Sequence, residues 1–235
     1  IFLKGGKMAQ FNTAKNIIVG AAPLYISAYD STDATNYKEN LLDRPSSGIS
    51  FTPGTSAATT LAADSKVRNV GYTNNGLQIT YNPTYDAVTV DQLLDTAKLF
   101  KSAMEVMIAT EMSEGTLENI LVVFGQKAST ISTTGTAPAE TSTLGLEAGA
   151  LGVQPTERQL FAVGQAPTVN SAGTDVYSER VYYARRVLSV QQSQFTLARN
   201  TPTTFPVTFR LLPDSRYSGS EYGKIIDRTS GTAWA

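Results

Sequence analysis

Three glutamates, Glu111, Glu114 and Glu118, have the spacing in this chain that comes nearest to an acid–base or metal-binding group. Such sites use a second kind of base or ligand beside the carboxylates. The chain contains no His and no Cys, which removes imidazole bases, thiolate nucleophiles, Cys/His zinc sites and Ser-His-Asp triads. The acidic start of a helix explains Glu114 and Glu118 more simply, because carboxylates stabilise its positive end. We therefore expect a protein that is not an enzyme and that has no metal or cofactor.

Arginines and tyrosines alternate between residues 177 and 186, in the sequence YSERVYYARR. Basic and aromatic residues interleaved in this way occur on surfaces that stack nucleotides. The alternative is an exposed strand face on which Arg180, Arg185 and Arg186 pair with acids of an adjacent strand or subunit. Nineteen basic and twenty acidic side chains give a net charge of −1, which is unlike the basic surface of a protein that grips nucleic acid. The charge balance therefore favours the alternative.

The composition predicts a core and a surface that is short of charge. Apolar residues make up 41% of the 235 residues, and charged residues make up 17%, below the roughly 25% of ordinary soluble domains. A surface of this kind suggests burial against further copies of the chain. No apolar run approaches the roughly 20 residues that span a bilayer, and the N-terminal sequence lacks the apolar centre of a secretory signal. We expect a soluble protein made in a cytoplasm, with no membrane binding of its own.

Strand patterns dominate the chain. Leu77, Ile79 and Tyr81 alternate with polar residues after the turn signal Asn74-Asn75-Gly76, and Asn82-Pro83 then predicts a break. Apolar residues at every second position predict a strand over residues 205–211, and Pro206 inside it indicates a sheet edge or a bulge. Further strands are expected at residues 16–26, 87–90, 159–163, 176–190, 193–199 and 222–226, with a turn at residues 169–174.

One short helix is expected before Gly125. Ser113, Glu114 and Thr116 supply a capping oxygen and acidic first-turn residues, and the apolar residues that follow line one helical face. Residues 91–112 are ambiguous, because Leu93, Leu94, Ala97, Phe100 and Met104 could also line one face of a helix.

Two polar stretches are predicted to be loops. Residues 30–66 form too long an unpatterned segment for an ordinary connection, so we interpret them as an interaction arm. Residues 128–143 are rich in Ser, Thr, Ala and Gly and predict a second polar loop. Candidate contacts between subunits or stacked rings are the apolar anchors of the first stretch, Tyr37, Leu41, Leu42 and Phe51.

Three phrases, in this order, resemble the tail tube proteins of long-tailed bacteriophages. NIIVGAAPLYIS resembles their opening strand, and VGYTNNGLQITY followed by VTVDQLLD resembles their central paired strands. EMSEGTLENILVVFG resembles the acid, Thr-Leu-Glu-Asn phrase and short helix that follow, here Glu111, Thr116, Leu117, Glu118 and Asn119. The resemblance runs from residue 16 to about residue 227 and favours a strand over residues 104–110.

The resemblance implies a mainly β fold, a β-sandwich or barrel with one short flanking α-helix and long loops. It implies an N-terminal arm at residues 1–15 and a single β domain at residues 16–235. Six copies would form a ring, and rings would stack head to tail into the tail tube of the virion, a conduit for double-stranded DNA during ejection into a bacterium. Partners would be the tape measure, terminator and baseplate proteins, with assembly in the host cytoplasm.

The resemblance also gives candidate residues for the channel wall or for pairing between subunits: Gln78, Thr80, Thr89, Arg180, Arg185 and Arg186. An inward arginine would recur six times in every ring and would retain DNA through counterion release. We therefore expect a neutral to acidic channel in which these arginines are paired with acids or turned into subunit contacts.

Two alternatives remain at this point. A monomeric β-rich binding module, such as an adhesin or decoration domain, would use its polar loops to contact a ligand or a cell surface. A different virion part, such as a tail terminator or the inner tube of a contractile injection machine, would share most of the same sequence features.

Overall fold

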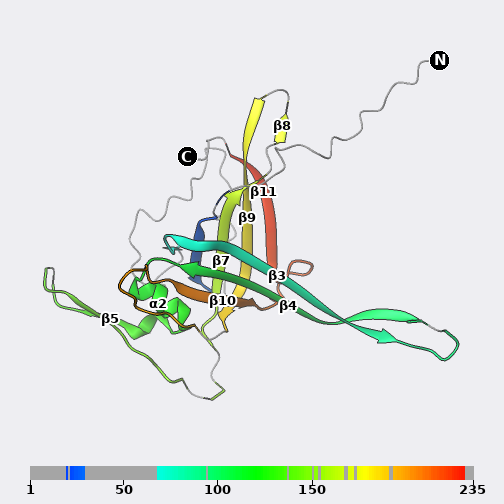
Figure 1. Cartoon of the computed structure of the whole chain (residues 1–235), viewed down its shortest axis with the longest axis horizontal. Coiled ribbons are helices and arrows are strands. Elements are labelled where there is room, and N and C mark those ends of the chain that lie inside the picture. The colour runs from blue at the N-terminus through cyan, green and yellow to red at the C-terminus, as the bar shows by residue number, and fades with distance from the viewer. Residues whose placement is uncertain are drawn as a thin grey trace.

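The structure is a computed structural model that describes residues 20, 22–29, 68–93, 95–136, 138–149, 151–152, 155–166, 169–171, 174–190 and 193–230. The predicted arms at residues 1–15 and 30–66, with Tyr37, Leu41, Leu42 and Phe51, lie outside the described residues. The described chain is mainly β, with antiparallel strands and one short α-helix (Figure 1). This confirms the predicted fold class.

The main sheet is built around one long strand, β9 (Thr174–Ser189). Along one side of β9 lies β7 (Arg158–Gln165), followed outward by β1 (Leu24–Ala28) and β2 (Arg68–Asn69). The other side is divided between two partners: β11 (Gly223–Ser230) pairs with residues 177–184, and β10 (Phe205–Leu211) pairs with residues 187–189. The short strand β8 (Val169–Ser171) forms a hairpin with the start of β9, where the sequence predicted only a turn.

The second partner of β10 is β4 (Lys98–Met112), which in turn pairs with β3 (Thr73–Val88). Figure 1 shows β3 and β4 running across the direction of β9 and β11 and projecting as a hairpin well beyond the rest of the sheet. The main strand order is therefore β2-β1-β7-β9-β10-β4-β3. β4 confirms the strand predicted at residues 104–110 and excludes the helical interpretation of residues 98–112.

The core follows the alternation of the strands. Phe205, Val207, Phe209 and Leu211 of β10 are buried, as their spacing predicted, and pack with residues of β1, β4 and β7. Pro206 pairs only with β4, because β9 pairs with β10 from Phe209 onward. The proline, which has no N–H, therefore costs no hydrogen bond on the edge of β10 that faces β9.

The helix α2 (Leu117–Val123) covers part of this core with Leu121, Val122 and Val123. The Thr116 side chain caps it by accepting a hydrogen bond from the Asn119 backbone N–H. Gly125 ends it with φ +66°, a conformation that glycine adopts without strain. The predicted helix and its end are confirmed.

Two predicted interruptions of β3 are wrong. Asn75 and Gly76 have φ values of 60° and 68° and form a bulge inside β3, where the register with β4 shifts between Asn74 and Gln78. Asn82 and Pro83 continue the pairing with Glu105 and Met104. β3 tolerates the proline because its other edge has no partner among the described strands.

Three more expectations need correction. The described residues 193–199 form no strand. The predicted polar loop at residues 128–143 contains a 3-10 turn, η2 (Ala128–Thr130), and a hairpin of β5 (Ile131–Thr134) and β6 (Thr141–Leu144). Ile131 and Leu144 pair at its base and pack against the core, and hydroxyl pairs, Ser132 with Thr143 and Thr133 with Ser142, support the exposed remainder. Residues 16–19 and 21 of the predicted first strand lie outside the described residues, in which β1 begins at Leu24; the last strand extends beyond its predicted end to Ser230.

Candidate assembly surfaces and the arginine cluster

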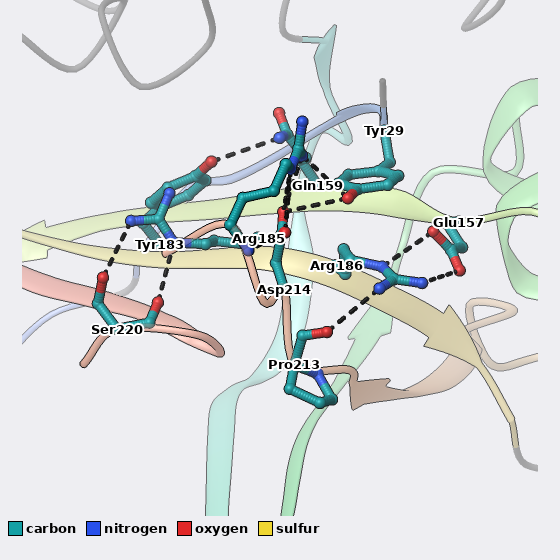
Figure 2. Close-up of polar contacts among 10 residues, drawn as sticks. Tyr29, Glu157, Gln159, Tyr183, Arg185, Arg186, Pro213, Asp214 and Ser220 are labelled. Atoms are coloured by element: carbon teal, nitrogen blue, oxygen red, sulfur yellow. Dashed lines mark hydrogen bonds and ion pairs between the residues drawn. The ribbon is translucent and has the colours of Figure 1, made fainter. Parts of the chain in front are cut away.

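A β-bulge brings Arg185 and Arg186 into one cluster. Arg158 of β7 pairs with Val187, and Leu160 pairs with Ala184, so Gln159 alone lies opposite both arginines. In a regular strand, adjacent side chains point to opposite faces. The bulge breaks this alternation, so the side chains of both arginines contact the same loop, residues 212–222 (Figure 2).

Arg185 is 1% exposed and holds this loop to β9. Its Nε and Nη2 donate to the carbonyl and the hydroxyl of Ser220 at 2.9 and 3.3 Å. Its guanidinium carbon lies 3.6 Å from the ring centre of Tyr217 and 5.2 Å from that of Tyr183. The expectation that all three arginines lie on an exposed strand face is therefore wrong for Arg185.

Arg186 makes a two-pronged ion pair with Glu157. Its Nε and Nη2 lie 3.0 and 2.5 Å from the two carboxylate oxygens, and its Nη1 donates to the Pro213 carbonyl at 3.1 Å. The bond to Glu157 raises the pKa of Arg186 above its ordinary value. The predicted pairing of this arginine with an acid is confirmed.

Asp214 and Arg216 form the second ion pair of the cluster. Arg216 Nη2 lies 2.8 Å from Asp214 Oδ2, and it also donates to the Tyr29 hydroxyl, which in turn donates to the same Oδ2. The Arg216 side chain, more than any other contact, lowers the pKa of Asp214 to about 2. Burial and the bond to Asp214 raise the pKa of Tyr29. Asp214 therefore stays charged and Tyr29 stays neutral near pH 7, so the pair cross-links β1 to the loop and holds no proton ready for transfer.

We call these residues the arginine cluster: Tyr29, Glu157, Tyr183, Arg185, Arg186, Asp214, Arg216, Tyr217 and Ser220. Arg180 lies outside it and pairs with Asp227 of β11, with both bonds at 2.6 Å. The bond to Arg180 lowers the pKa of Asp227. Arg180 and Arg186 are thus both paired with acids, as expected.

The three glutamates first considered as a chemical site have separate contacts. Glu111 accepts from Asn74 Nδ2 at 3.5 Å, and Glu114 accepts from the backbone N–H of Tyr72 at 3.0 Å. Glu118 lies in the first turn of α2; burial lowers the pKa of Arg68, and the charge of the nearby Glu118 carboxylate opposes that shift. Among the described residues, no group of three or more Asp or Glu side chains is arranged to hold a metal ion.

A buried hydrogen-bond network beneath α2 was not identified from the sequence. Asn119 is fully buried; its Nδ2 donates to the carbonyls of Val70 and Glu114 at 2.8 and 2.9 Å, and its Oδ1 accepts from Arg68 at 2.8 Å. Arg158 donates to the Gln126 carbonyl just beyond the helix, and its burial lowers its pKa to about 10. Neither arginine was identified from the sequence, because their partners lie far away along the chain.

The hairpin of β3 and β4 is the most exposed part of the described chain. Every described residue from Thr84 to Ala103 is exposed, on both faces of the two-stranded ribbon. Tyr81, Tyr85 and Leu99 are 65%, 57% and 63% exposed. Gln78, Thr80 and Thr89 are exposed on or just beyond the edge strand β3, which does not pair with the strand that bears the arginines.

An open apolar groove lies where β3 and β4 cross β9 and β11. It is lined by Ile79, Tyr81, Val106, Ile108, Tyr182, Tyr183, Ala184, Leu211, Tyr222, Gly223, Lys224 and Ile225, and its volume is about 210 Å³. Small-molecule sites are usually larger, roughly 300–1,000 Å³, and contain several converging polar groups. The groove is better suited to a few apolar side chains than to a cofactor.

The described residues contain no helix of the length and hydropathy needed to span a bilayer. No known protein-family model matches the sequence, and no curated protein is significantly similar to it.

Proposed function

We propose that this chain is a structural, non-enzymatic virion protein whose copies assemble into hexameric rings that stack head to tail as the tail tube of a long-tailed bacteriophage. The ordered resemblance of three sequence phrases supports the family and the six-fold ring. In this role the chain contacts further copies of itself and the tape measure, terminator and baseplate proteins, and double-stranded DNA passes through the channel.

The projecting hairpin is the observation that carries the proposal. An isolated two-stranded ribbon is marginally stable in water, and this one exposes Tyr81, Tyr85 and Leu99 with no cover from the described part of its own chain. A second copy would cover these side chains. The binding-module alternative gives the long apolar hairpin no such partner.

Unpaired strand edges support the same conclusion. Among the described strands, β2, β3 and β11 each have a partner on one side only. Such edges favour pairing with another chain, and closure into a ring removes them. The low charged fraction of the sequence, 17%, fits a surface that becomes buried in an assembly.

The paired arginines fit a channel through which DNA passes without being retained. Arg180 and Arg186 each have a carboxylate partner, and Arg185 is buried against the loop. A DNA phosphate would have to compete with these carboxylates for the arginines. Fewer phosphates would then be neutralised and fewer counterions released, so the DNA would bind more weakly.

Light scattering over a range of protein concentrations tests the proposal. We expect the mass to rise far above that of one chain and to reach multiples of a hexamer. A mass that stays at one chain over the whole range would contradict self-assembly and would favour the monomeric binding module.

A further inference from the structure

The tip of the hairpin, residues 89–97, has the character of an inserting element. Its sequence, TVDQLLDTA, contains the acids Asp91 and Asp95 and no basic residue. Val90 and Leu93 are 39% and 57% exposed. The backbone N–H of Leu93 donates to the Val90 carbonyl at 3.1 Å, so the two exposed residues bracket one tight turn.

The apolar groove is concave, and its lining contains a basic residue where the tip contains acids. Tyr81 and Val106 pair across the hairpin, as do Ile79 and Ile108, so all four side chains share the face that lines the groove. Ile225 of β11 forms the other wall and is 68% exposed. Lys224 is the only charged residue of the lining, and it is basic where the tip is acidic.

We propose that the hairpin tip of one copy seats in the apolar groove of the next copy, with Val90 and Leu93 against Ile225 and with Asp91 or Asp95 near Lys224. The inference rests on the proposed self-assembly and names the surfaces that carry it. Both surfaces lack cover from the described part of the same chain, they match in apolar character, and their charges are complementary.

The contact is heterologous, because the tip and the groove are different surfaces of one subunit. Contacts of this kind generate closed rings or open filaments, depending on the rotation between copies. The groove lies at the root of the same hairpin, and the nine residue steps from Ile79 to Val88 span about 30 Å at ~3.3 Å per residue. Each copy would thus place its hairpin tip in the groove of one neighbour, and the hairpin tip of that neighbour would reach the groove of the copy after it, so the contact repeats.

The chain contains no cysteine, so introduced cysteines would be the only sites for thiol-specific cross-linking. In the double variant Leu93→Cys/Ile225→Cys, a short bis-maleimide should link the tip of each copy to the groove of the next. We expect a ladder of covalent oligomers on a denaturing gel. The matched control Leu197→Cys/Ile225→Cys, whose Leu197 is 80% exposed and lines neither surface, should give no ladder.

A mixture of the two single variants provides a second measurement. Leu93→Cys and Ile225→Cys together should give a covalent dimer that contains one copy of each, and this species should be lost when either variant is treated alone. Cross-linking of Leu93→Cys to itself, without the mixed dimer, would overturn the inference in favour of a tip-to-tip contact. Absence of both products while the wild-type chain assembles by light scattering would overturn this pairing alone, whereas a monomeric wild type would overturn the proposed function as well.

Discussion

The guanidinium of Arg185 lies over the ring of Tyr217, with its central carbon 3.6 Å from the ring centre. Tyr217 belongs to the loop between β10 and β11, and Arg185 belongs to the bulge of β9, so this contact fixes the loop where the sheet divides between the two partners of β9. The groove at the root of the hairpin includes Tyr222 from the end of the same loop. The arginine cluster thus holds one wall of the proposed assembly surface.

Replacement of Arg185 by methionine should lower the free energy of unfolding by about 2–4 kcal/mol, because the partly buried Ser220 carbonyl and hydroxyl lose their charged donor and the tyrosine contact is lost with it. Urea unfolding at low protein concentration measures the change. Arg210→Met is the matched control: Arg210 is half exposed and lies 3.8 Å from Glu105, so less than about 1 kcal/mol should be lost. Equal losses in both variants would contradict the structural role of Arg185.

Asn119→Ala should destabilise the chain by about 2–4 kcal/mol, because it leaves the Val70 and Glu114 carbonyls and an Arg68 donor without partners in a buried site. Asn74→Ala is the control, since Asn74 is exposed and makes one long bond to Glu111. Thermal unfolding followed by circular dichroism compares the two variants. A melting temperature for Asn119→Ala equal to that of Asn74→Ala would show that the buried asparagine is dispensable.

Stability should fall in acid through Asp214. Its folded pKa of about 2 lies below the unfolded value near 3.9, so its contribution is complete above about pH 5 and is lost as the pH falls toward 2. The shift corresponds to about 2 kcal/mol at neutral pH. Urea unfolding between pH 2 and pH 6 should therefore show a steeper loss for the wild type than for Asp214→Asn. Parallel curves would mean that Asp214 is not stabilised by Arg216.

Arg180 is a candidate residue of the channel wall, and with Arg180 in that position Asp227→Asn should increase the retention of double-stranded DNA by assembled tubes. The substitution leaves Arg180 without its acid, and the change recurs six times in each ring of the proposed hexamer. Bound DNA should fall as salt rises, because phosphate neutralisation releases counterions. Glu147→Gln, which removes one exposed acid elsewhere, controls for net charge, and equal retention by both variants would remove Arg180 from the channel wall.

Local sequence patterns predicted the elements whose conformation is determined by their own residues. β10 was predicted by its strict alternation, since one face of it is buried, and α2 by its cap, its apolar face and the glycine after it. The strand over residues 104–110 could not be derived from periodicity, because the apolar residues of the longer segment, residues 91–112, also fit a helical face. Pairing with β3 and β10 decides its conformation.

The remaining features depend on distant partners. Tyr29 and Asp214 are 185 residues apart in sequence and meet through a single hydrogen bond. The burial of Arg185 depends on a bulge and on a loop whose Ser220 lies 35 residues away in the sequence. Pro83 predicted a break, but β3 continues through it because an edge strand tolerates a missing donor. No local pattern carries this information.

Electron microscopy of the purified full chain tests the central claim most directly. We expect end-on views of six-fold rings with a central channel and side views of tubes built by their stacking. A field of compact single particles of one chain each, at concentrations where the protein remains folded, would contradict the tail tube assignment and with it the account of the hairpin as an assembly element.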